Sequence, residues 1–144
     1  MTMQDKDGRA LLGEIGAARQ ALEDGARAEA IARQHARGKR SARERVARLV
    51  DPGSLREFGS LVAAEGAGEA GRETAPADGV ITGVATLDGR PAVVVVQDFT
   101  VFGGSIGKLG SAKTQRAVQI AVTRGIPLVM VLDGGGHRIQ DGQD

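Results

Sequence analysis

The pattern of apolar and polar residues changes its period near the middle of the chain. In the first half, residues 9–37 mix Leu and Ile with Ala, Arg, Glu and Gln, which are strong helix formers, and predict one long helix. Ser41-Ala42-Arg43-Glu44 has the spacing of a capping box and predicts a second helix that runs to about Val50. Gly38 and Asp51-Pro52-Gly53 are the expected ends of these two helices.

The second half has the pattern of three strands and a helix. Residues 80–87 and 91–97 are apolar runs on either side of Asp88-Gly89, a signal for a two-residue β-hairpin. Residues 108–124 predict a helix and residues 128–132 another buried strand, so a βαβ unit with parallel strands is expected. The apolar positions expected along one side of that helix are Leu109, Ala112, Ala117, Ile120 and Ala121.

Two glycine-rich loops, residues 98–105 and 133–137, directly follow two of these apolar runs. The carboxyl ends of parallel strands share one edge of a sheet, which is where α/β proteins bind ligands. Consecutive glycine N–H groups are preorganised donors for an anion, so Gly135 and Gly136 suit an oxyanion hole. A tight turn that needs glycine only for its backbone is an equally good interpretation. Residues 63–78, rich in Ala, Gly, Glu and Pro, predict a flexible surface loop.

The amino-acid composition argues against most other kinds of catalytic or binding site. The 144 residues predict a single domain, and with no Cys and only His35 and His137 we expect neither thiolate chemistry nor a metal. The net charge of +1 and the polar amino terminus predict no general nucleic-acid partner, no membrane partner and a cytoplasmic location. Residues 27–48 contain eight Lys or Arg, for which a solvated or subunit-facing surface is favoured and a weak attraction for ligand phosphates is the next alternative. Without interleaved aromatics, nucleic-acid binding is disfavoured.

Few side chains suggest conventional catalysis. Asp98 and Asp133 are either a carboxylate pair across the sheet edge or, as we favour, caps of the turns that follow them. His137 is either a base or, more simply, an exposed histidine. Ser105 lacks the Gly-x-Ser-x-Gly context of a nucleophile elbow, and neither glycine loop has the spacing of a P-loop or a dinucleotide fingerprint.

Four motifs in the same order along the chain resemble the carboxyltransferase β subunits of biotin-dependent acyl-CoA carboxylases. The family carries Gly-Lys-x-Thr/Ser-Ala-Arg-Glu-Arg, then Leu-x-Asp-Pro-Gly-Ser, and later Asp-Ser-Gly-Gly-Ala-Arg-Ile-Gln-Glu-Gly. The resemblance covers about residues 36–144, whereas residues 1–30 are not diagnostic. The matching segments are residues 38–45 with 51–54, residues 78–83, residues 97–105 and residues 133–140.

The resemblance implies an α/β crotonase/ClpP-like fold, here partial, with amino-terminal helices before a β-hairpin and the βαβ unit. Residues 1–53 would be an amino-terminal helical segment, and residues 54–144 a carboxyltransferase domain truncated at its carboxyl end. The implied reaction transfers a carboxyl group from carboxybiotin to an acyl-CoA of the acetyl or propionyl type. Backbone N–H groups of Gly135 and Gly136 would stabilise the thioester enolate, and biotin would accept the α-proton.

The remaining implications concern the substrate, the partners and two departures from the family. Substrate contacts would come from Phe102, Gly103, Gly104, Ser105, Gly134 and His137. Gly134 replaces the usual Ser and His137 the usual Ala, which would change acyl preference or mark a lost activity.

The implied partners are a biotin carboxylase with its biotin carboxyl carrier protein, and further carboxyltransferase subunits or a carboxyl-terminal half. We therefore expect a fragment with little or no activity alone. The alternatives are the decarboxylase branch of the same fold, or a non-catalytic module for CoA binding or assembly.

Overall fold

A four-stranded mixed sheet forms the centre of the computed structural model, which describes residues 7–63 and 75–139. The strands follow chain order across the sheet and are β1 (Arg56–Phe58), β2 (Val80–Leu87), β3 (Arg90–Gln97) and β4 (Leu128–Val131). β1 and β2 pair antiparallel, as do β2 and β3, whereas β3 and β4 are parallel. The predicted hairpin and βαβ unit are both confirmed.

The hairpin turn shows why its sequence signal is strong. Leu87 pairs with Arg90, so Asp88 and Gly89 form a two-residue loop with φ of 48° and 74°. Left-handed values at both positions define a type I′ turn, which matches the twist of the flanking strands. Asp51, which is not part of the hairpin, stabilises the turn, because its carboxylate accepts hydrogen bonds from the N–H groups of both turn residues.

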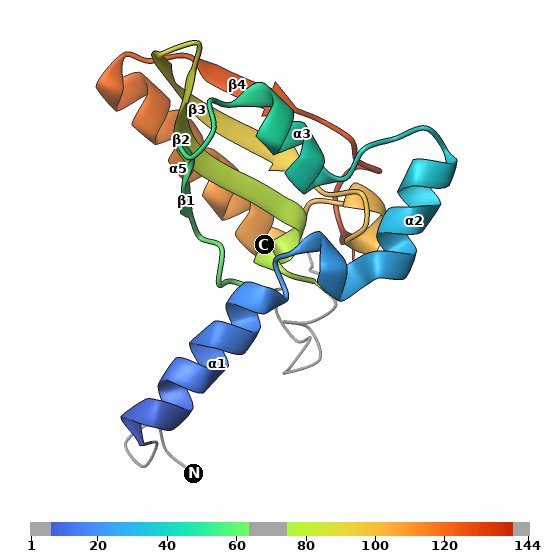
Figure 1. Cartoon of the computed structure of the whole chain (residues 1–144). Helices are drawn as coiled ribbons and strands as arrows, with labels where there is room; N and C mark the ends of the chain where they lie inside the picture. Colours follow the sequence, from blue (N-terminus) through green and yellow to red (C-terminus); the bar gives the residue numbers. More distant parts are fainter. Residues whose placement is uncertain (1–6, 64–74, 140–144) are drawn as a thin grey trace.

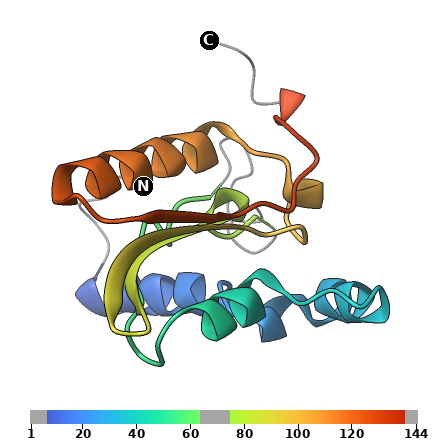
Figure 2. The same ribbon diagram turned by 90° about the horizontal axis from the view of Figure 1, so that it is seen from above.

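Helices cover both faces of the sheet, as Figure 2 shows. The helix α5 (Lys108–Arg124) packs on one face and α3 (Ala42–Leu49) on the other, and α1 (Gly8–Gln20) and α2 (Ala28–Ala36) lie on the same side of the sheet as α3. Both faces of β3 are therefore buried, and Val93, Val94, Val95 and Val96 are at most 1% exposed. One cluster joins Val93 and Val95 to Ala117 and Ala121 of α5, and another joins Val96 to Ala42 and Val46 of α3.

The side of α5 that faces the sheet differs from the predicted one at one position. Ala117 and Ala121 are buried as predicted, but Ala112 is exposed and Lys113 is buried in its place. The ammonium of Lys113 donates a hydrogen bond to the carbonyl of Ala77 at 2.9 Å, so the charged end has a polar partner inside the protein. Gly125 ends the helix in the left-handed conformation, as predicted.

The single helix predicted over residues 9–37 is wrong, because the chain bends between α1 and α2. A short 3-10 helix, η2 (Asp24–Arg27), separates them, and α1 extends away from the sheet in Figure 1. The guanidinium of Arg27 causes the bend: it donates to the carbonyl of Ala21 at 2.7 Å and to the carboxylate of Asp98 at 3.0 Å. This long-range ion pair outweighs the local helix propensity of the segment.

The predicted start of the next helix and the end of the preceding one are confirmed. Gly38 follows α2 with φ of 70°. Ser41 caps α3 through a complete capping box, in which its hydroxyl accepts from the Glu44 N–H and Glu44 accepts from the Ser41 N–H.

The surface loop predicted over residues 63–78 is wrong at its carboxyl end. Residues 64–74 lie outside the described part, but Ala75, Ala77 and Asp78 are buried. Ala77 to Gly79 form a left-handed 3-10 turn, η3 (Ala77–Gly79), with φ of 54°, 48° and 72°.

Candidate functional site

The two glycine loops meet at one edge of the sheet, where β3 and β4 end. Their backbones are in direct contact: a Cβ on Gly104 would lie 2.2 Å from the carbonyl oxygen of Asp133, and one on Gly134 would lie 2.4 Å from that of Gly104. As the two loops lie here, neither Gly104 nor Gly134 has room for a Cβ unless the backbone shifts. The expected convergence of residues 98–105 and 133–137 is confirmed.

The first loop contains a left-handed turn, η4 (Phe102–Gly104). The φ angles of Phe102, Gly103 and Gly104 are 46°, 64° and 70°, and a non-glycine residue adopts such a value at an energetic cost. The hydroxyl of Ser105 donates to the Phe102 carbonyl at 2.9 Å and closes the turn. The strained turn leaves the Phe102 residue 54% exposed beside the second loop.

Gly135 and Gly136 in the second loop are exposed and have open space beside them. A Cβ on Gly136, whose φ is 101°, would meet no atom within 4 Å, and one on Gly135 would meet only the Gly103 carbonyl at 3.5 Å. Within residues 7–63 and 75–139, the N–H groups of Gly135 and Gly136 donate no hydrogen bond. Preorganised, unused donors of this kind can stabilise an oxyanion.

A short parallel bridge fixes the end of the second loop against the end of the first. The N–H of Ile106 donates to the carbonyl of Gly136 at 2.8 Å, and the N–H of Arg138 donates to the carbonyl of Ile106 at 2.9 Å. His137 lies between these two bonds in an isolated bridge with Ile106, and it is exposed. The structure thus places His137 next to the two glycines without giving its ring a partner among the described residues.

Asp98 and Asp133 do not form a carboxylate pair. One cationic side chain pairs with Asp98, and two others pair with Asp133. Asp98 pairs with Arg27 and also accepts from the N–H of Thr100 at 2.9 Å, so the predicted turn cap is confirmed. Asp133 instead binds Lys39 at 2.9 Å and Arg45 at 2.6 Å. Burial raises the pKa of Asp133, but these two cations outweigh it and hold the pKa below its usual value.

The basic stretch over residues 27–48 has a structural use that its sequence did not reveal. Four of its eight cations make ion pairs to acidic residues of the sheet or its loops. These four are Arg27, Lys39, Arg43 and Arg45, and their partners are Asp98, Asp133 and Glu57. The amino-terminal helices are therefore held electrostatically against the carboxyl ends of the strands.

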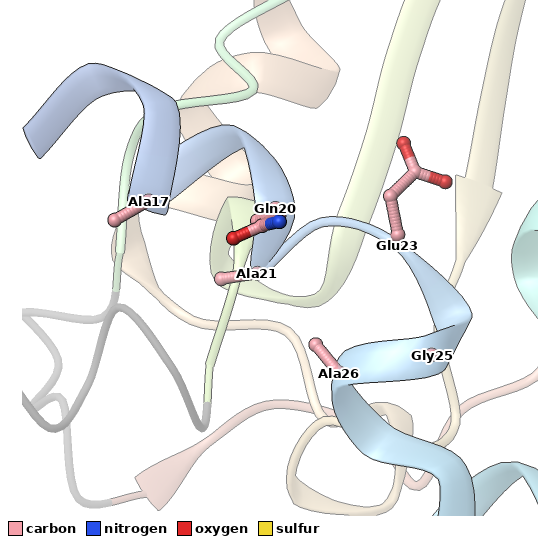
Figure 3. A pocket seen from close by; sticks show the side chains of 6 residues that line it. All are labelled: Ala17, Gln20, Ala21, Glu23, Gly25 and Ala26. Carbon is pink, nitrogen blue, oxygen red and sulfur yellow. The ribbon is translucent and has the colours of Figure 1, made fainter. Parts of the chain in front are cut away.

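Two other kinds of site find no support near the glycine loops. The described residues include no group of three His, Cys, Asp or Glu side chains that could hold a metal. A pocket opens between the end of α1 and η2, and none of its described lining residues belongs to a glycine loop (Figure 3). Those residues are Ala17, Gln20, Ala21, Glu23, Gly25 and Ala26.

Sequence reasoning missed the buried polar residues that support the loops. Gln97 accepts from the N–H of Asp133 through its side-chain oxygen at 2.8 Å, and so ties the end of β3 to the start of the second loop. Asp78 and Arg138 form a buried ion pair. Asp78 lies in the motif of residues 78–83 and Arg138 in that of residues 133–140. Their place in these motifs was the signal that the sequence offered, but it does not indicate that the two side chains pair.

The geometry agrees with solved structures of carboxyltransferases. A single-chain, multi-domain long-chain acyl-CoA carboxylase matches 96% of this chain with a TM-score of 0.86 and 35% identity, over 15% of its own length. Transcarboxylase 12S, solved with methylmalonyl-CoA and methylmalonic acid bound, matches 95% of this chain with a TM-score of 0.81 and 36% identity, over 27% of its own length. The fold is therefore α/β of the crotonase-like class.

Sequence comparison agrees at the level of the family. The carboxyl transferase domain family matches residues 33–144, and the chain belongs to that family of enzymes. The propionyl-CoA carboxylase beta chain of Saccharopolyspora erythraea is 45% identical over 114 residues, which are 78% of this chain and 21% of that protein. The methylmalonyl-CoA decarboxylase subunit alpha of Veillonella parvula is 41% identical over 116 residues, 79% of this chain and 23% of that protein.

The chain thus spans between a fifth and a quarter of the length of these curated relatives. None of the helices in the described ranges is both long and apolar enough to cross a membrane.

Proposed function

We propose that this chain supplies part of the acyl-CoA site of a biotin-dependent carboxyltransferase, which transfers a carboxyl group from carboxybiotin to the α-carbon of an acyl-CoA. The single observation that carries the proposal is that the N–H groups of Gly135 and Gly136, at the sheet edge where two parallel strands end, have no acceptor among the described residues. Membership of the carboxyl transferase family supports the same reaction class. The relatives that act on propionyl-CoA favour a short acyl group.

In this proposal the chain acts through its backbone. The N–H groups of Gly135 and Gly136 donate to the thioester oxygen as negative charge develops on it, which stabilises the enolate. The residues Phe102 to Ser105 form the wall along the acyl-CoA, and Gly134 and His137 complete the contact with the substrate. Carboxybiotin would supply the carboxyl group, and the biotin nitrogen freed by loss of that group would take the α-proton, so the proposal assigns no protein side chain as base.

The same proposal defines the partners. Biotin arrives on a biotin carboxyl carrier protein after a biotin carboxylase has loaded it, and another carboxyltransferase subunit or half supplies the remaining side of the site. This assembly would act in the cytoplasm. Residues 1–53 serve in it as a helical segment, and residues 54–144 as the part of the crotonase-like domain that carries the two glycine loops.

The decarboxylase direction is a second candidate, and the decarboxylase subunit of Veillonella parvula favours it. In that direction the same two N–H groups stabilise the enolate that forms when the carboxyl group leaves a malonyl-CoA or methylmalonyl-CoA. Assays of both half-reactions on the same preparation distinguish the two directions. Net formation of malonyl-CoA or methylmalonyl-CoA supports carboxylation, and activity confined to the reverse half-reaction contradicts it.

A graft tests the role of the second loop. Residues 33–144 replace the matching segment of transcarboxylase 12S, and carboxyl transfer is measured for Gly135→Pro and Gly135→Ala. Proline removes the N–H, whereas alanine keeps it and adds a Cβ at ordinary contact distance from Gly103. We expect kcat to fall about 100- to 1,000-fold for Gly135→Pro, the usual loss for one oxyanion donor.

The alanine variant is the matched control and should stay within about tenfold of the unsubstituted graft. Equal kcat for the two variants would contradict the proposal and favour a non-catalytic CoA-binding or assembly role. The 144-residue chain by itself is expected to form no detectable malonyl-CoA or methylmalonyl-CoA from a biotin donor.

A further inference from the structure

Arg138 links the two glycine loops through a buried side chain and a backbone hydrogen bond. Its side chain is 5% exposed, and its guanidinium donates a hydrogen bond to the carbonyl of Ser105 at 3.1 Å, at the end of the first loop. The same guanidinium lies over the Phe102 ring, 4.4 Å from the ring centroid. Its backbone N–H belongs to the bridge that holds Gly136. Arg138 therefore joins the two loops of the proposed oxyanion site, through its side chain to the first and through its backbone to the end of the second.

Asp78 holds the guanidinium in place. One carboxylate oxygen accepts from Arg138 at 2.6 Å, and the other accepts from the N–H of Gly110 at 2.7 Å in the first turn of α5. The carboxylate side chain is 1% exposed and lies at the positive end of the helix. Arg138 is thus anchored to the rigid helix that connects β3 to β4, and not to a surface group.

The turn that contains Asp78 is held in place by the residues around it. Its residues adopt left-handed φ, and the buried ammonium of Lys113 donates to the carbonyls of Ala77 and Val80 on both sides of it. A Cβ on Gly79 would approach Val101 at 3.2 Å, so the turn also packs closely against the first loop. Movement of Asp78 would therefore require both the turn and α5 to move.

We infer that Arg138 is the positioning residue of this site: its buried guanidinium, anchored by Asp78, sets the separation between the Phe102–Ser105 wall and the Gly135 and Gly136 donors. The inference rests on the proposed function of the second loop. A charge-assisted, multi-donor contact fixes the distance and the angle together, which a single hydrogen bond does not. A displacement of about 1 Å in a reacting group can cost roughly 100-fold in rate.

The first test measures loop geometry without activity. Amide resonances of Gly103, Gly104, Gly135 and Gly136 are compared in the 144-residue chain for the unsubstituted protein and Arg138→Lys. Lysine keeps the charge but cannot reach Asp78, Ser105 and Phe102 at once. We expect resonances of both loops to shift together and their amide exchange to accelerate. Unchanged resonances in a folded Arg138→Lys variant overturn the inference.

A matched control separates positioning from general stability. Arg43 makes a two-bond ion pair with Glu57 at 2.6 and 3.1 Å, on the other side of the sheet from α5. Arg43→Lys should therefore leave the resonances of all four glycines where they are. Shifts of equal size in Arg43→Lys and Arg138→Lys overturn the inference, because both loops would then respond to any loosening of the fold.

A second variant covers the case in which a lone change at Arg138 prevents folding. The double substitution Asp78→Asn with Arg138→Met removes both buried charges together, so neither is left uncompensated. We expect this variant to fold with both glycine loops displaced. Native loop resonances in the double variant overturn the inference.

Kinetics of the transcarboxylase 12S graft give the last measurement. Positioning predicts that Arg138→Lys lowers kcat by about tenfold or more while KM for the acyl-CoA changes less than about threefold. A purely structural role predicts fewer folded sites with the same kcat per site, and that result overturns the inference. If Arg138→Lys moves the loops but Gly135→Pro leaves kcat unchanged, the proposed function of the second loop fails on its own.

Discussion

The carbonyl oxygen of Asp133 occupies the space that a side chain on Gly104 would need. A Cβ there would lie 2.2 Å from that oxygen and 2.8 Å from the Cα of Gly134, distances that no relaxation of a side chain can relieve because both atoms are backbone. The contact joins the ends of two strands that are parallel neighbours. It leaves no room for a Cβ where the end of the first loop meets the start of the second.

Gly104→Ala should therefore be far more damaging than Gly103→Ala. Both residues have left-handed φ, 70° and 64°, but a Cβ on Gly103 would meet no atom within 4 Å. Strain alone costs about 1 kcal/mol at Gly103, whereas strain and the collision together cost about 3 kcal/mol or more at Gly104. Urea unfolding of the two variants measures the difference. Equal losses would show that the two loops can separate freely.

Acid should weaken the ion pairs of Asp133. Its folded pKa lies below the usual 3.8 because Lys39 and Arg45 outweigh the effect of burial, so its contribution to stability is complete above about pH 4. That contribution is lost as the pH falls towards the lowered value. Compared with the unsubstituted chain, Asp133→Asn should show a shallower fall in the free energy of unfolding below pH 4. Asp88→Asn, at an exposed turn position, is the control and should keep the original slope.

Lys113 should make the protein more stable as the pH rises above 8. Burial lowers its pKa to about 8, although Glu57 and Asp78 raise it and Arg43 lowers it further. Between pH 8 and 10.5 the unfolded chain holds a proton that the folded chain has released, so the free energy of unfolding increases with pH. The gain reaches up to about 3 kcal/mol at roughly 1.4 kcal/mol per pKa unit.

Denaturant titrations of the unsubstituted chain, Lys113→Met and Lys108→Met from pH 7 to 10.5 check this expectation. The rise should disappear in Lys113→Met and remain in Lys108→Met, because Lys108 is exposed at the start of α5. If the free energy of unfolding still rises with pH in Lys113→Met, another titrating group causes the rise.

Loss of the capping box should destabilise the attachment of α3. The hydroxyl of Ser41, which is 2% exposed, accepts from the Glu44 N–H and donates to Asp24. Ser41→Ala removes both bonds and should cost about 1–2 kcal/mol in thermal or urea unfolding. Ser111→Ala, within α5, should change the free energy of unfolding by less than about 0.5 kcal/mol. Equal effects would mean that the cap is not formed in solution.

The parts of the fold that were predicted correctly are those fixed by neighbouring residues. Asp88-Gly89 specifies its turn through local φ preferences, and Ser41 with Glu44 specifies a helix start through two adjacent hydrogen bonds. The bend at Arg27 was missed because its cause, Asp98, lies 71 residues away. Lys113 was missed for the same kind of reason: its carbonyl partners belong to a turn that the composition of residues 63–78 did not indicate.

The site was predicted in part. Parallel strands brought the glycine loops together as expected, and the close approach of Gly104 and Gly134 follows from their lack of side chains. The pairing of Arg138 with Asp78 could not be predicted from either local pattern, because nothing in residues 78–83 or 133–140 indicates a buried partner. The roles of Gly135 and Gly136 stay a prediction.

The ion pairs of Arg27, Lys39 and Arg45 have a practical consequence for anyone who shortens this chain. An expression boundary placed at residue 53 would remove all three cations and leave the carboxylates of Asp98 and Asp133 without these counter-ions at the ends of β3 and β4. The two uncompensated negative charges would then oppose the approach of any anionic ligand to this edge of the sheet, including the acyl-CoA of the proposed function. The amino-terminal helices thus supply counter-ions to both glycine loops, and a trimmed domain would lack this neutralisation even if its sheet folded.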